Sequence, residues 1–366
     1  MYVAKASDSD DRPYVALAYL FGMWYTPWCW NKTSMPRRAK VEFNECLAWL
    51  AGIVDGEGTI AITKTGNYFQ HYVSVGNTST KIIEMVDSLF SAVSGRGHIS
   101  THTEGDRIHK SAWIVRVSSR PSVHAVVSGV LPYLVTKIDQ GQLAIRSLEM
   151  GCTGDHFEAM RMLNQRGPLG RVRSSSQGLQ HMPMNQRLAW LGGIVDGEGS
   201  LTLGLVRARA AQNKSGFSQL ARFEVHIANT NENMLEEIMD ISRTNGIGCC
   251  WVRGKPRPTE RPTHRVVWLG MPRCQALLRL VRPYLVAKGQ HADVMLKAIE
   301  HRQVSQRTKS GYGHSAVVDD GVLIDLLQDL KRLNARGICS EPVPDQFTHV
   351  VARQGSELVS RGRGAG

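Results

Sequence analysis

Long apolar runs are missing from this chain, and among its cysteines only Cys249 and Cys250 are adjacent. Its seven cysteines are scattered along 366 residues without a C-x-x-C pair, and such spacing fits neither a zinc site nor a disulfide framework. The most apolar stretch, residues 14–30, is interrupted by Pro27 and is too short for a membrane span. Acids at Asp8, Asp10 and Asp11 stand where a signal peptide carries basic residues. We therefore expect an intracellular protein without a membrane-spanning segment. A leader or a translated upstream sequence appended to the core is the alternative for the N-terminal residues.

Acidic residues are in short supply relative to basic ones. The chain has 44 Lys and Arg against 32 Asp and Glu, which gives a formal net charge of +12 and a pI near 9.5. An excess of this size favours a polyanionic partner, either nucleic acid or an anionic membrane surface, although a basic soluble protein without such a partner fits the charge equally well. The length favours two or three compact units.

What the chain does contain is one ten-residue motif that occurs twice. Residues 49–58 read W-L-A-G-I-V-D-G-E-G and residues 190–199 read W-L-G-G-I-V-D-G-E-G, so nine of ten positions are identical. Apolar residues at helical spacing lead into small residues, which predicts a helix that ends at glycines and turns into a strand. Asn44 and Asn185 are candidate N-caps of the two helices.

The motif opens a longer repeat. V-L-P-Y-L-V-T-K at 130–137 matches V-R-P-Y-L-V-A-K at 281–288, and between the landmarks each half shows the same order of helical and strand patterns, α-β-β-α-β-β-α. We therefore predict an α+β protein with two pseudo-symmetric αββαββα domains, at 41–150 and 185–303, joined at the two motif helices. Each closing helix is predicted to be continuous.

The remaining segments look peripheral. Residues 1–40 form an N-terminal extension, and residues 304–366 form a C-terminal extension with one amphipathic helix and a Gly/Arg-rich flexible tail. Residues 151–184 are rich in arginine, glycine and serine, which predicts a basic linker. The linker is either a solvated connection or one that follows a phosphate backbone, and both roles are compatible.

Small residues ahead of the acids predict a close contact between the two motif helices. Short side chains at Ala51, Gly52, Gly192 and Gly193 would let the two backbones approach. The negative helix ends and their carboxylates would then lie side by side and repel each other. A divalent cation would relieve this repulsion, and oxygen ligands completed by water and phosphate favour Mg²⁺.

Such a metal site could cleave a phosphodiester bond. Glu57 and Glu198 are the candidate metal ligands, and the backbones of Gly56 and Gly197 could contribute. The alternative is a structural helix pair whose acids only cap the following turn. Two identical copies favour the metal site.

Further polar residues occur at matching places in the two halves. Lys137 and Lys288 each follow a proline by five residues and could stabilise transition-state charge, although a solvated helix lysine is the commoner case. Asn77 and Asn229 end matching strands and could orient water, or could simply satisfy the next turn. All four are candidate catalytic residues.

The polar faces of the predicted strands suit phosphate and base-edge contacts in DNA. The two antiparallel sheets would together form a saddle on the duplex. The candidate DNA-binding residues are Thr59, Thr63, Lys64, Gln70, His71, Thr202, Arg207, Arg209, Lys214, Gln219 and Arg222.

The two motifs resemble the signature of the LAGLIDADG homing endonucleases, in the single-chain, two-motif form that introns encode. L-A-G-I-V-D-G-E-G at 50–58 and L-G-G-I-V-D-G-E-G at 191–199 match it, with glutamate in place of the usual aspartate at the eighth position. The resemblance spans about residues 42–335. It implies a monomer that cuts both strands of a long, asymmetric DNA site in a mitochondrion, a chloroplast or the bacterial cytoplasm, with two or three divalent ions at the domain interface.

The resemblance also implies roles for single residues. Glu57 and Glu198 would be the metal-binding catalytic acids, while Asp55 and Asp196 would serve the helix ends and the interface. Relatives include RNA maturases, for which the partner would be the host intron RNA, and a DNA-binding regulator with a vestigial site. Retained acids and lysines argue against the vestigial site but leave maturase work open.

Overall fold

The computed structural model describes residues 41–94, 99–102, 112–165, 178–208, 218–254, 262–308 and 321–334. The chain from Lys40 onwards belongs to one compact unit. Within the described residues, no helix combines the length and the apolar character that a membrane crossing requires.

The first half contains four strands and the helices that pack on them. Its antiparallel sheet has the order β1-β2-β4-β3. The elements are α1 (Phe43–Glu57), β1 (Gly58–Thr65), β2 (Tyr68–Asn77), α2 (Thr80–Ser94), β3 (Ile99–His102), β4 (Ala112–Val117), α3 (Arg120–Val130), the 3-10 helix η1 (Leu131–Tyr133), α4 (Ile138–Met150) and α5 (Gly154–Leu163).

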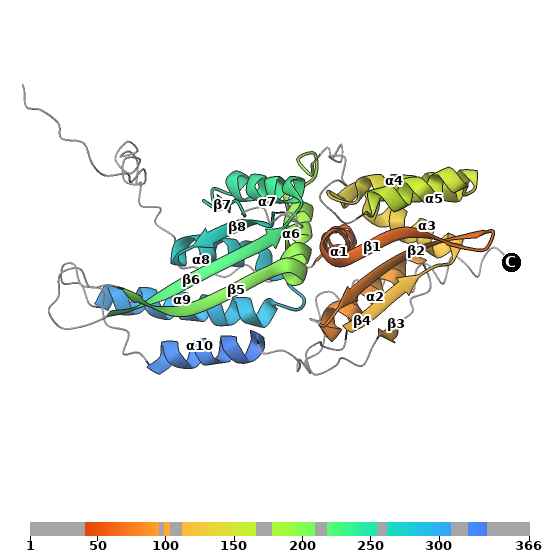
Figure 1. Ribbon diagram of the computed structural model, residues 1–366. Coiled ribbons are helices and arrows are strands. Elements are labelled where there is room, and N and C mark those ends of the chain that lie inside the picture. Colours follow the sequence, from red (N-terminus) through yellow and green to blue (C-terminus); the bar gives the residue numbers. More distant parts are fainter. Residues whose placement is uncertain are drawn as a thin grey trace, which may run out of the picture. The chain divides into compact units, whose positions relative to one another are not determined.

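The second half repeats this order, and its sheet β5-β6-β8-β7 has the same topology. Its elements are α6 (Met184–Glu198), β5 (Gly199–Ala208), β6 (Ser218–Asn229), α7 (Glu232–Thr244), β7 (Cys250–Val252), β8 (His264–Leu269), α8 (Met271–Val281), the 3-10 helix η2 (Arg282–Tyr284), α9 (Gly289–Thr308) and α10 (Gly321–Asn334). Helices α1 and α6 lie side by side between the two sheets (Figure 1). The α+β prediction with two antiparallel sheets is confirmed.

Each sheet buries one face under helices. Ile60 pairs with Val73 across β1 and β2, and both side chains are buried. Thr63 pairs with Gln70 on the opposite face, and both are exposed. Because residues that face each other across strands share a face of the sheet, the register divides each sheet into a core face and an open face.

The predicted closing helix of each half is in fact interrupted. In the first half α3 ends at Val130, η1 follows, and α4 starts only at Ile138. Pro132 lies in η1 and has no backbone N–H to donate to a continuing helix. The second half shows the same break, with Pro283 in η2. The extended segment after each 3-10 helix turns out to bind the motif helices.

The motif helices begin earlier than the candidate caps suggested. Helix α1 starts at Phe43, where Glu42 and Glu45 form a reciprocal capping box. Helix α6 starts at Met184 after Pro183. Asn185 is therefore helical, and its amide donates to Glu45 Oε1 in the other half at 2.7 Å.

Part of the predicted linker is a helix. Helix α5 is capped by Thr153, whose hydroxyl accepts from the His156 N–H, and it buries Met160. The Asn164 side chain then donates to the carbonyl of Ile60 at 2.9 Å. In the second half, Asn334 at the end of α10 donates to the carbonyl of Leu201 at 3.4 Å.

Helices α5 and α10 are thus equivalent, since Ile60 and Leu201 each follow a motif glutamate by three residues. The duplication is longer than the sequence patterns predicted. A short signal was present in the chain, because R-M-L-N at 161–164 resembles K-R-L-N at 331–334. Both asparagines satisfy a carbonyl of a sheet-edge strand, β1 in one half and β5 in the other.

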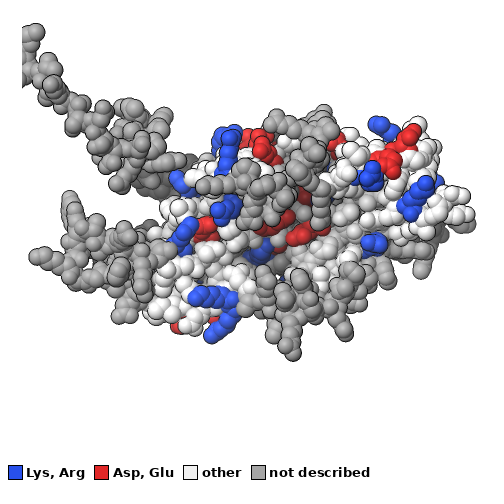
Figure 2. Space-filling view, viewed as in Figure 1, with Lys and Arg blue, Asp and Glu red and all other residues white. Residues whose placement is uncertain are grey.

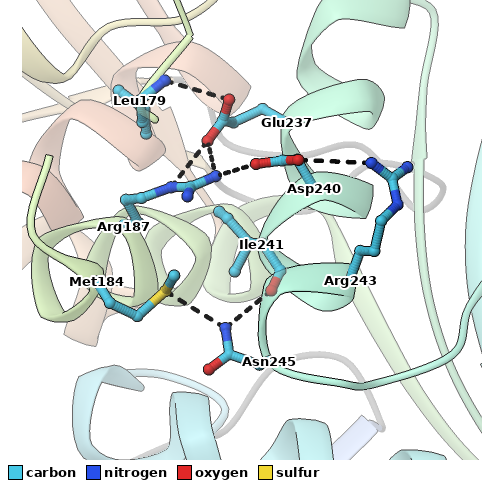
Figure 3. Close-up of polar contacts among 8 residues, drawn as sticks. All are labelled: Leu179, Met184, Arg187, Glu237, Asp240, Ile241, Arg243 and Asn245. Carbon is cyan, nitrogen blue, oxygen red and sulfur yellow. Dashed lines mark hydrogen bonds and ion pairs between the residues drawn. The ribbon is translucent and has the colours of Figure 1, made fainter. Parts of the chain in front are cut away.

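A buried charge network joins two helices of the second half (Figure 3). Arg187 of α6 contacts Glu237 and Asp240 of α7, each at 2.7 Å. Glu237 also accepts from the backbone N–H of Leu179 at 3.2 Å, so the network fixes the segment that leads into α6. The first half has the apolar Cys46 where the repeat places Arg187. Losing one partner here would leave a buried charge without compensation.

Candidate active site at the two motif helices

Helices α1 and α6 meet backbone against backbone. A Cβ atom added at Gly52 would lie 2.2 Å from the carbonyl oxygen of Trp190, and one at Gly193 would lie 2.2 Å from that of Trp49. No side chain fits at either position. The helices therefore cross at these two glycines.

Gly192 needs a correction as an interface residue. A Cβ atom there would meet Tyr284 of η2 at 2.7 Å, within its own half, rather than α1. Its counterpart Ala51 is buried. The second position of each small-residue pair, Gly52 or Gly193, carries the contact between the helices.

Both motif glutamates are the last residues of their helices. Gly58 is already extended, with φ −82° and ψ 167°, and its N–H still donates to the Val54 carbonyl. A Cβ atom at Gly58 would lie 2.6 Å from Val54 Cα, so only glycine permits this turn. Gly199 repeats the arrangement against Val195. The helix-to-strand junction therefore fixes the position of each glutamate.

The two glutamates lie across the helix contact from each other. A Cβ atom at Gly56 would be 3.2 Å from Glu198 Cγ, and one at Gly197 would be 3.3 Å from Glu57 Cγ. Burial raises the pKa of Glu57. Burial and then the charge of Glu57 raise the pKa of Glu198 to about 7, against the effect of Lys288 and Lys137. The carboxylates repel each other where solvent is scarce.

This pair fits a hard divalent cation. Within the described ranges, no three His, Cys, Asp or Glu side chains cluster as metal ligands. The protein would thus supply two carboxylates and backbone oxygens, and Mg²⁺ commonly completes such a shell with water and phosphate oxygens. The raised pKa of Glu198 gives a cation a direct stabilising role, because it would neutralise the repulsion.

The motif aspartates face inward and organise the segments after the 3-10 helices. Asp55 accepts from the backbone N–H groups of Val135, Thr136 and Lys137 at 2.8 to 3.0 Å. In the second half, Asp196 accepts from those of Val286, Ala287 and Lys288 at 2.7 to 3.1 Å. We call residues 134–137 and 285–288 the lysine turns, since each ends at a lysine.

Each aspartate also accepts from a tryptophan of the other half. Trp49 Nε1 donates to Asp196 Oδ2 at 3.0 Å, and Trp190 Nε1 donates to Asp55 Oδ2 at 3.0 Å. The two tryptophans are fully buried. These crossed hydrogen bonds join residues 147 and 135 positions apart in the chain.

Both lysines reach the ends of the motif helices. Lys137 Nζ donates to the carbonyls of Val54 and Asp55 at 2.7 and 2.6 Å. Lys288 Nζ donates to those of Val195 and Asp196 at 2.8 and 2.7 Å, and burial lowers its pKa. A positive charge stabilises the negative end of a helix. The lysines thus lie beside the glutamates and also hold the helix ends in place.

The strand-end asparagines bind the turns that follow. Asn77 Oδ1 accepts from the backbone N–H of Ser79 at 2.8 Å, and Asn229 Oδ1 accepts from that of Asn231 at 2.9 Å. The structure therefore shows the turn-forming role, and a water-holding role stays a prediction.

The candidate DNA-binding residues divide between the two faces of the sheets. His71 lies on the core face, 5% exposed, with its Nε2 2.6 Å from Ser147 Oγ, so its assignment to the DNA surface was wrong. Its register partner Ile62 is also buried. Because successive side chains of a strand point to opposite faces, His71 and its neighbour Gln70 cannot both lie on the DNA-facing side. Thr63, Gln70, Thr202 and Arg222 are exposed on the open faces, where Thr59 is half-buried. Lys64 is exposed as well, but its register with Phe69 places it on the same side of the sheet as Ile62, so its assignment to the open face was wrong.

For the remaining candidates the structure says less. Arg207 and Gln219 are paired in the register of β5 and β6. Arg209 and Lys214 fall outside the described residues.

Two features of the open faces were missed by sequence reasoning. Arg116 of β4 stacks on Tyr72, with its guanidinium carbon 4.5 Å from the ring centroid. On β6, Glu224 forms an ion pair with Arg222 and lies 3.0 Å from His226 Nδ1. The repeat places Tyr72 and Glu224 at equivalent positions, so the two open faces differ in chemistry.

Comparisons with known proteins identify the fold of this chain. No protein-family profile matches the sequence. An uncharacterized protein of Methanocaldococcus jannaschii, MJ0314, is 32% identical over 68 residues, which are 19% of this chain and 25% of that relative. The matched segment thus spans about a quarter of the relative's length.

Solved structures match most of the chain. I-SmaMI, solved with cleaved DNA, is 16% identical and aligns over 78% of this chain and 95% of its own, with a TM-score of 0.54. I-CpaMI, solved with uncleaved DNA, is 13% identical over 79% and 98%, with a TM-score of 0.53. I-AabMI, also with uncleaved DNA, is 12% identical over 78% and 97%, with a TM-score of 0.54. All three are described as LAGLIDADG enzymes. This chain has the fold of these LAGLIDADG homing endonucleases, and each of the two helices that join its halves carries a motif that resembles their signature.

Proposed function

We propose that this protein is a divalent-metal-dependent, site-specific endonuclease that cuts both strands of DNA as a monomer. The meeting of Glu57 and Glu198 at the junction of two sheets carries the proposal. Two half-sites in one chain match the two strands of a duplex. The structural neighbours solved with cleaved and uncleaved DNA support duplex DNA as the partner.

The chemistry divides between the residues of the junction. Glu57 and Glu198 would hold Mg²⁺, with the backbones of Gly56 and Gly197 as further oxygen donors. Bound metal would activate water and stabilise the leaving oxygen. Lys137 and Lys288 fix the helix ends that present the glutamates, and their charge balances negative charge at the scissile phosphates.

The open faces of the sheets would bind the flanking duplex. The first offers Gln70 and the Arg116–Tyr72 stack, whereas the second offers the Arg222–Glu224–His226 group. Side chains of these types suit base edges and phosphates. Because the two faces differ, we propose a target that is asymmetric rather than palindromic. The intron-encoded origin and an intracellular location follow from the resemblance as part of the proposal.

Glutamine variants test the assignment of Glu57 and Glu198 as metal ligands. The target is first selected from a randomised duplex library, and cleavage is then followed on a supercoiled plasmid that carries it. Glu57→Gln and Glu198→Gln should each slow double-strand cleavage by about a hundredfold or more, since one metal ligand and its charge are lost, while duplex affinity changes little.

The exposed Glu84 of α2 provides a matched control, because Glu84→Gln removes the same charge from a solvent-exposed position on another helix. This variant should cut as the wild type does. Normal cutting by the Glu57→Gln, Glu198→Gln double variant would refute the site. Binding without cleavage by the wild type in Mg²⁺ or Mn²⁺ would indicate a DNA-binding regulator instead.

A further inference from the structure

We propose that Trp49 and Trp190 are positioning residues, each of which holds the lysine turn of the opposite half. Each half-site would then depend on a side chain that the other half supplies. The inference deepens the proposed function and rests on it for its catalytic consequence. The crossed hydrogen bonds themselves stand on geometry alone.

A series of hydrogen bonds, which we call a relay, leads from Trp49 in the first half through Asp196 to the lysine turn of the second half. Its Oδ2 accepts from Trp49 Nε1 at 3.0 Å and from the Val286 N–H at 2.7 Å. Its Oδ1 accepts from the Lys288 N–H at 2.8 Å. One carboxylate is therefore shared between a helix of the first half and the lysine turn of the second.

The reciprocal relay runs through Asp55. Its Oδ2 accepts from Trp190 Nε1 at 3.0 Å and from the Val135 N–H at 2.8 Å. Its Oδ1 accepts from the Lys137 N–H at 3.0 Å. The same three hydrogen bonds occur in both halves at nearly the same distances, so the crossing is a property of the repeat.

Each relay ends beside a glutamate. The Lys288 ammonium binds the carbonyls of Val195 and Asp196, which immediately precede Gly197 and Glu198. Trp49, on the helix that carries Glu57, is thereby connected to the end of the other helix, which carries Glu198. Trp190 is connected to Glu57 in the same way through Lys137.

Burial makes these contacts sensitive to a lost donor. Asp55 is 3% exposed and Asp196 2%, and both tryptophans are fully buried. A carboxylate that loses one donor in such a site has no ready replacement from water. Phenylalanine would fill most of the same space without the N–H, so apolar packing alone does not explain a tryptophan whose N–H reaches the other half.

The crossing predicts which half fails. A tryptophan that only packed the helix interface would affect both half-sites alike when replaced. In contrast, Trp49→Phe should loosen the turn at 285–288 and spare the turn at 134–137, and Trp190→Phe should do the reverse. Hydrogen exchange of peptides spanning the two turns measures this directly in the full chain.

The expected change is about a tenfold or greater increase in exchange rate at the opposite turn, as is typical for a lost hydrogen bond to a charged group. General destabilisation would accelerate both turns together, so the ratio of the two rates is the readout. A ratio that stays at the wild-type value in both variants would overturn the proposal. This measurement does not need an active enzyme.

Strand-resolved cleavage provides the second readout. Trp49→Phe should slow cutting of the same strand that Lys288→Met slows, and Trp190→Phe should share its strand with Lys137→Met. Equal slowing of both strands by each tryptophan variant would contradict a crossed role. If the wild type cuts no duplex, the proposed function fails, while the exchange ratio still decides the positioning role.

An isosteric replacement covers the case in which phenylalanine prevents folding. Benzothienylalanine at position 49 or 190 replaces the indole N–H with sulfur and keeps the ring volume. It should reproduce the shifted exchange ratio without the cavity that phenylalanine would leave. A wild-type ratio in this variant would show that the N–H contributes nothing.

Discussion

At the scale of the residue, Glu198 is a carboxyl whose ionisation is opposed both by burial and by the charge of Glu57. Its pKa rises from 4.5 to about 7, first through burial and then through Glu57. A carboxyl with a raised pKa binds its proton more tightly in the folded chain than in the unfolded one. Its contribution to stability is therefore complete below about pH 4.5 and is lost as the pH rises through 7.

Glu198→Gln should consequently stabilise the metal-free protein at high pH. We expect a gain on the order of 2 kcal/mol at pH 8, because glutamine removes the buried negative charge, and almost none at pH 4. Urea unfolding in the presence of EDTA at the two pH values measures it. Added Mg²⁺ should reduce the difference in unfolding free energy between the variant and the wild type at pH 8, because it stabilises the wild type. An equal effect of the substitution at both pH values would contradict the charge explanation.

Single residues also mark how far the sequence could lead. The identical motif copies and their spacing predicted that Glu57 and Glu198 would meet, because the same local pattern occurs twice. The Trp49–Asp196 contact joins residues far apart in the chain, and no periodicity reports on such a pair. His71 was assigned to the wrong face because the assignment followed residue type. The alternation of side chains along the strand places His71 on the same face as its buried partner Ile62.

At the scale of the element, the fold follows from patterns of one helix or strand. Helix and strand periodicity predicted most elements of both halves and their order along the chain, but not the order of the strands within each sheet. Helix α5 was hidden by the arginines and glycines around it, although Thr153 caps it. The interruption between α3 and α4 could not be predicted from local patterns. Backbone N–H groups of the segment 134–137 donate to Asp55, which lies far away in the sequence.

The helix contact gives a sharp prediction at this scale. Gly193→Ala should destabilise the protein by about 3 kcal/mol or more, because its Cβ would lie 2.2 Å from the Trp49 carbonyl and only a backbone shift can relieve that overlap. Gly129→Ala in α3 is the matched control. Its Cβ would meet only Leu47 and Val93 side chains at 3.6 Å or more.

The control should gain rather than lose stability. Alanine favours a helix over glycine by about 1 kcal/mol, and the space at Gly129 is sufficient. Thermal unfolding of the two variants at one pH decides between them. Similar unfolding temperatures for both would mean that α1 and α6 are not in direct backbone contact.

At the scale of the whole molecule, the net charge of +12 has to be related to the surface. On the face shown in Figure 2, basic side chains form several separate groups among uncharged residues, and acids occur between them. In the proposed complex, binding through such a surface would depend on many phosphate contacts along the duplex instead of one dense basic patch. The junction of Glu57 and Glu198 is acidic and, in the proposed function, would hold DNA through metal.

Such a surface predicts steep salt dependence of duplex binding. Affinity should fall by roughly a thousandfold or more between about 50 and 200 mM salt, as expected when several phosphates are neutralised.

Arg116→Gln should reduce the slope of log affinity against log salt by about one, because the Tyr72 stack holds this guanidinium on the open face. Arg279→Gln is the control, since Arg279 lies on α8 and pairs with Glu300 of α9. Fluorescence anisotropy with the selected duplex measures all three slopes. A flat response in the wild type, or equal slopes for the two arginine variants, would remove the open face of the first sheet from the DNA interface.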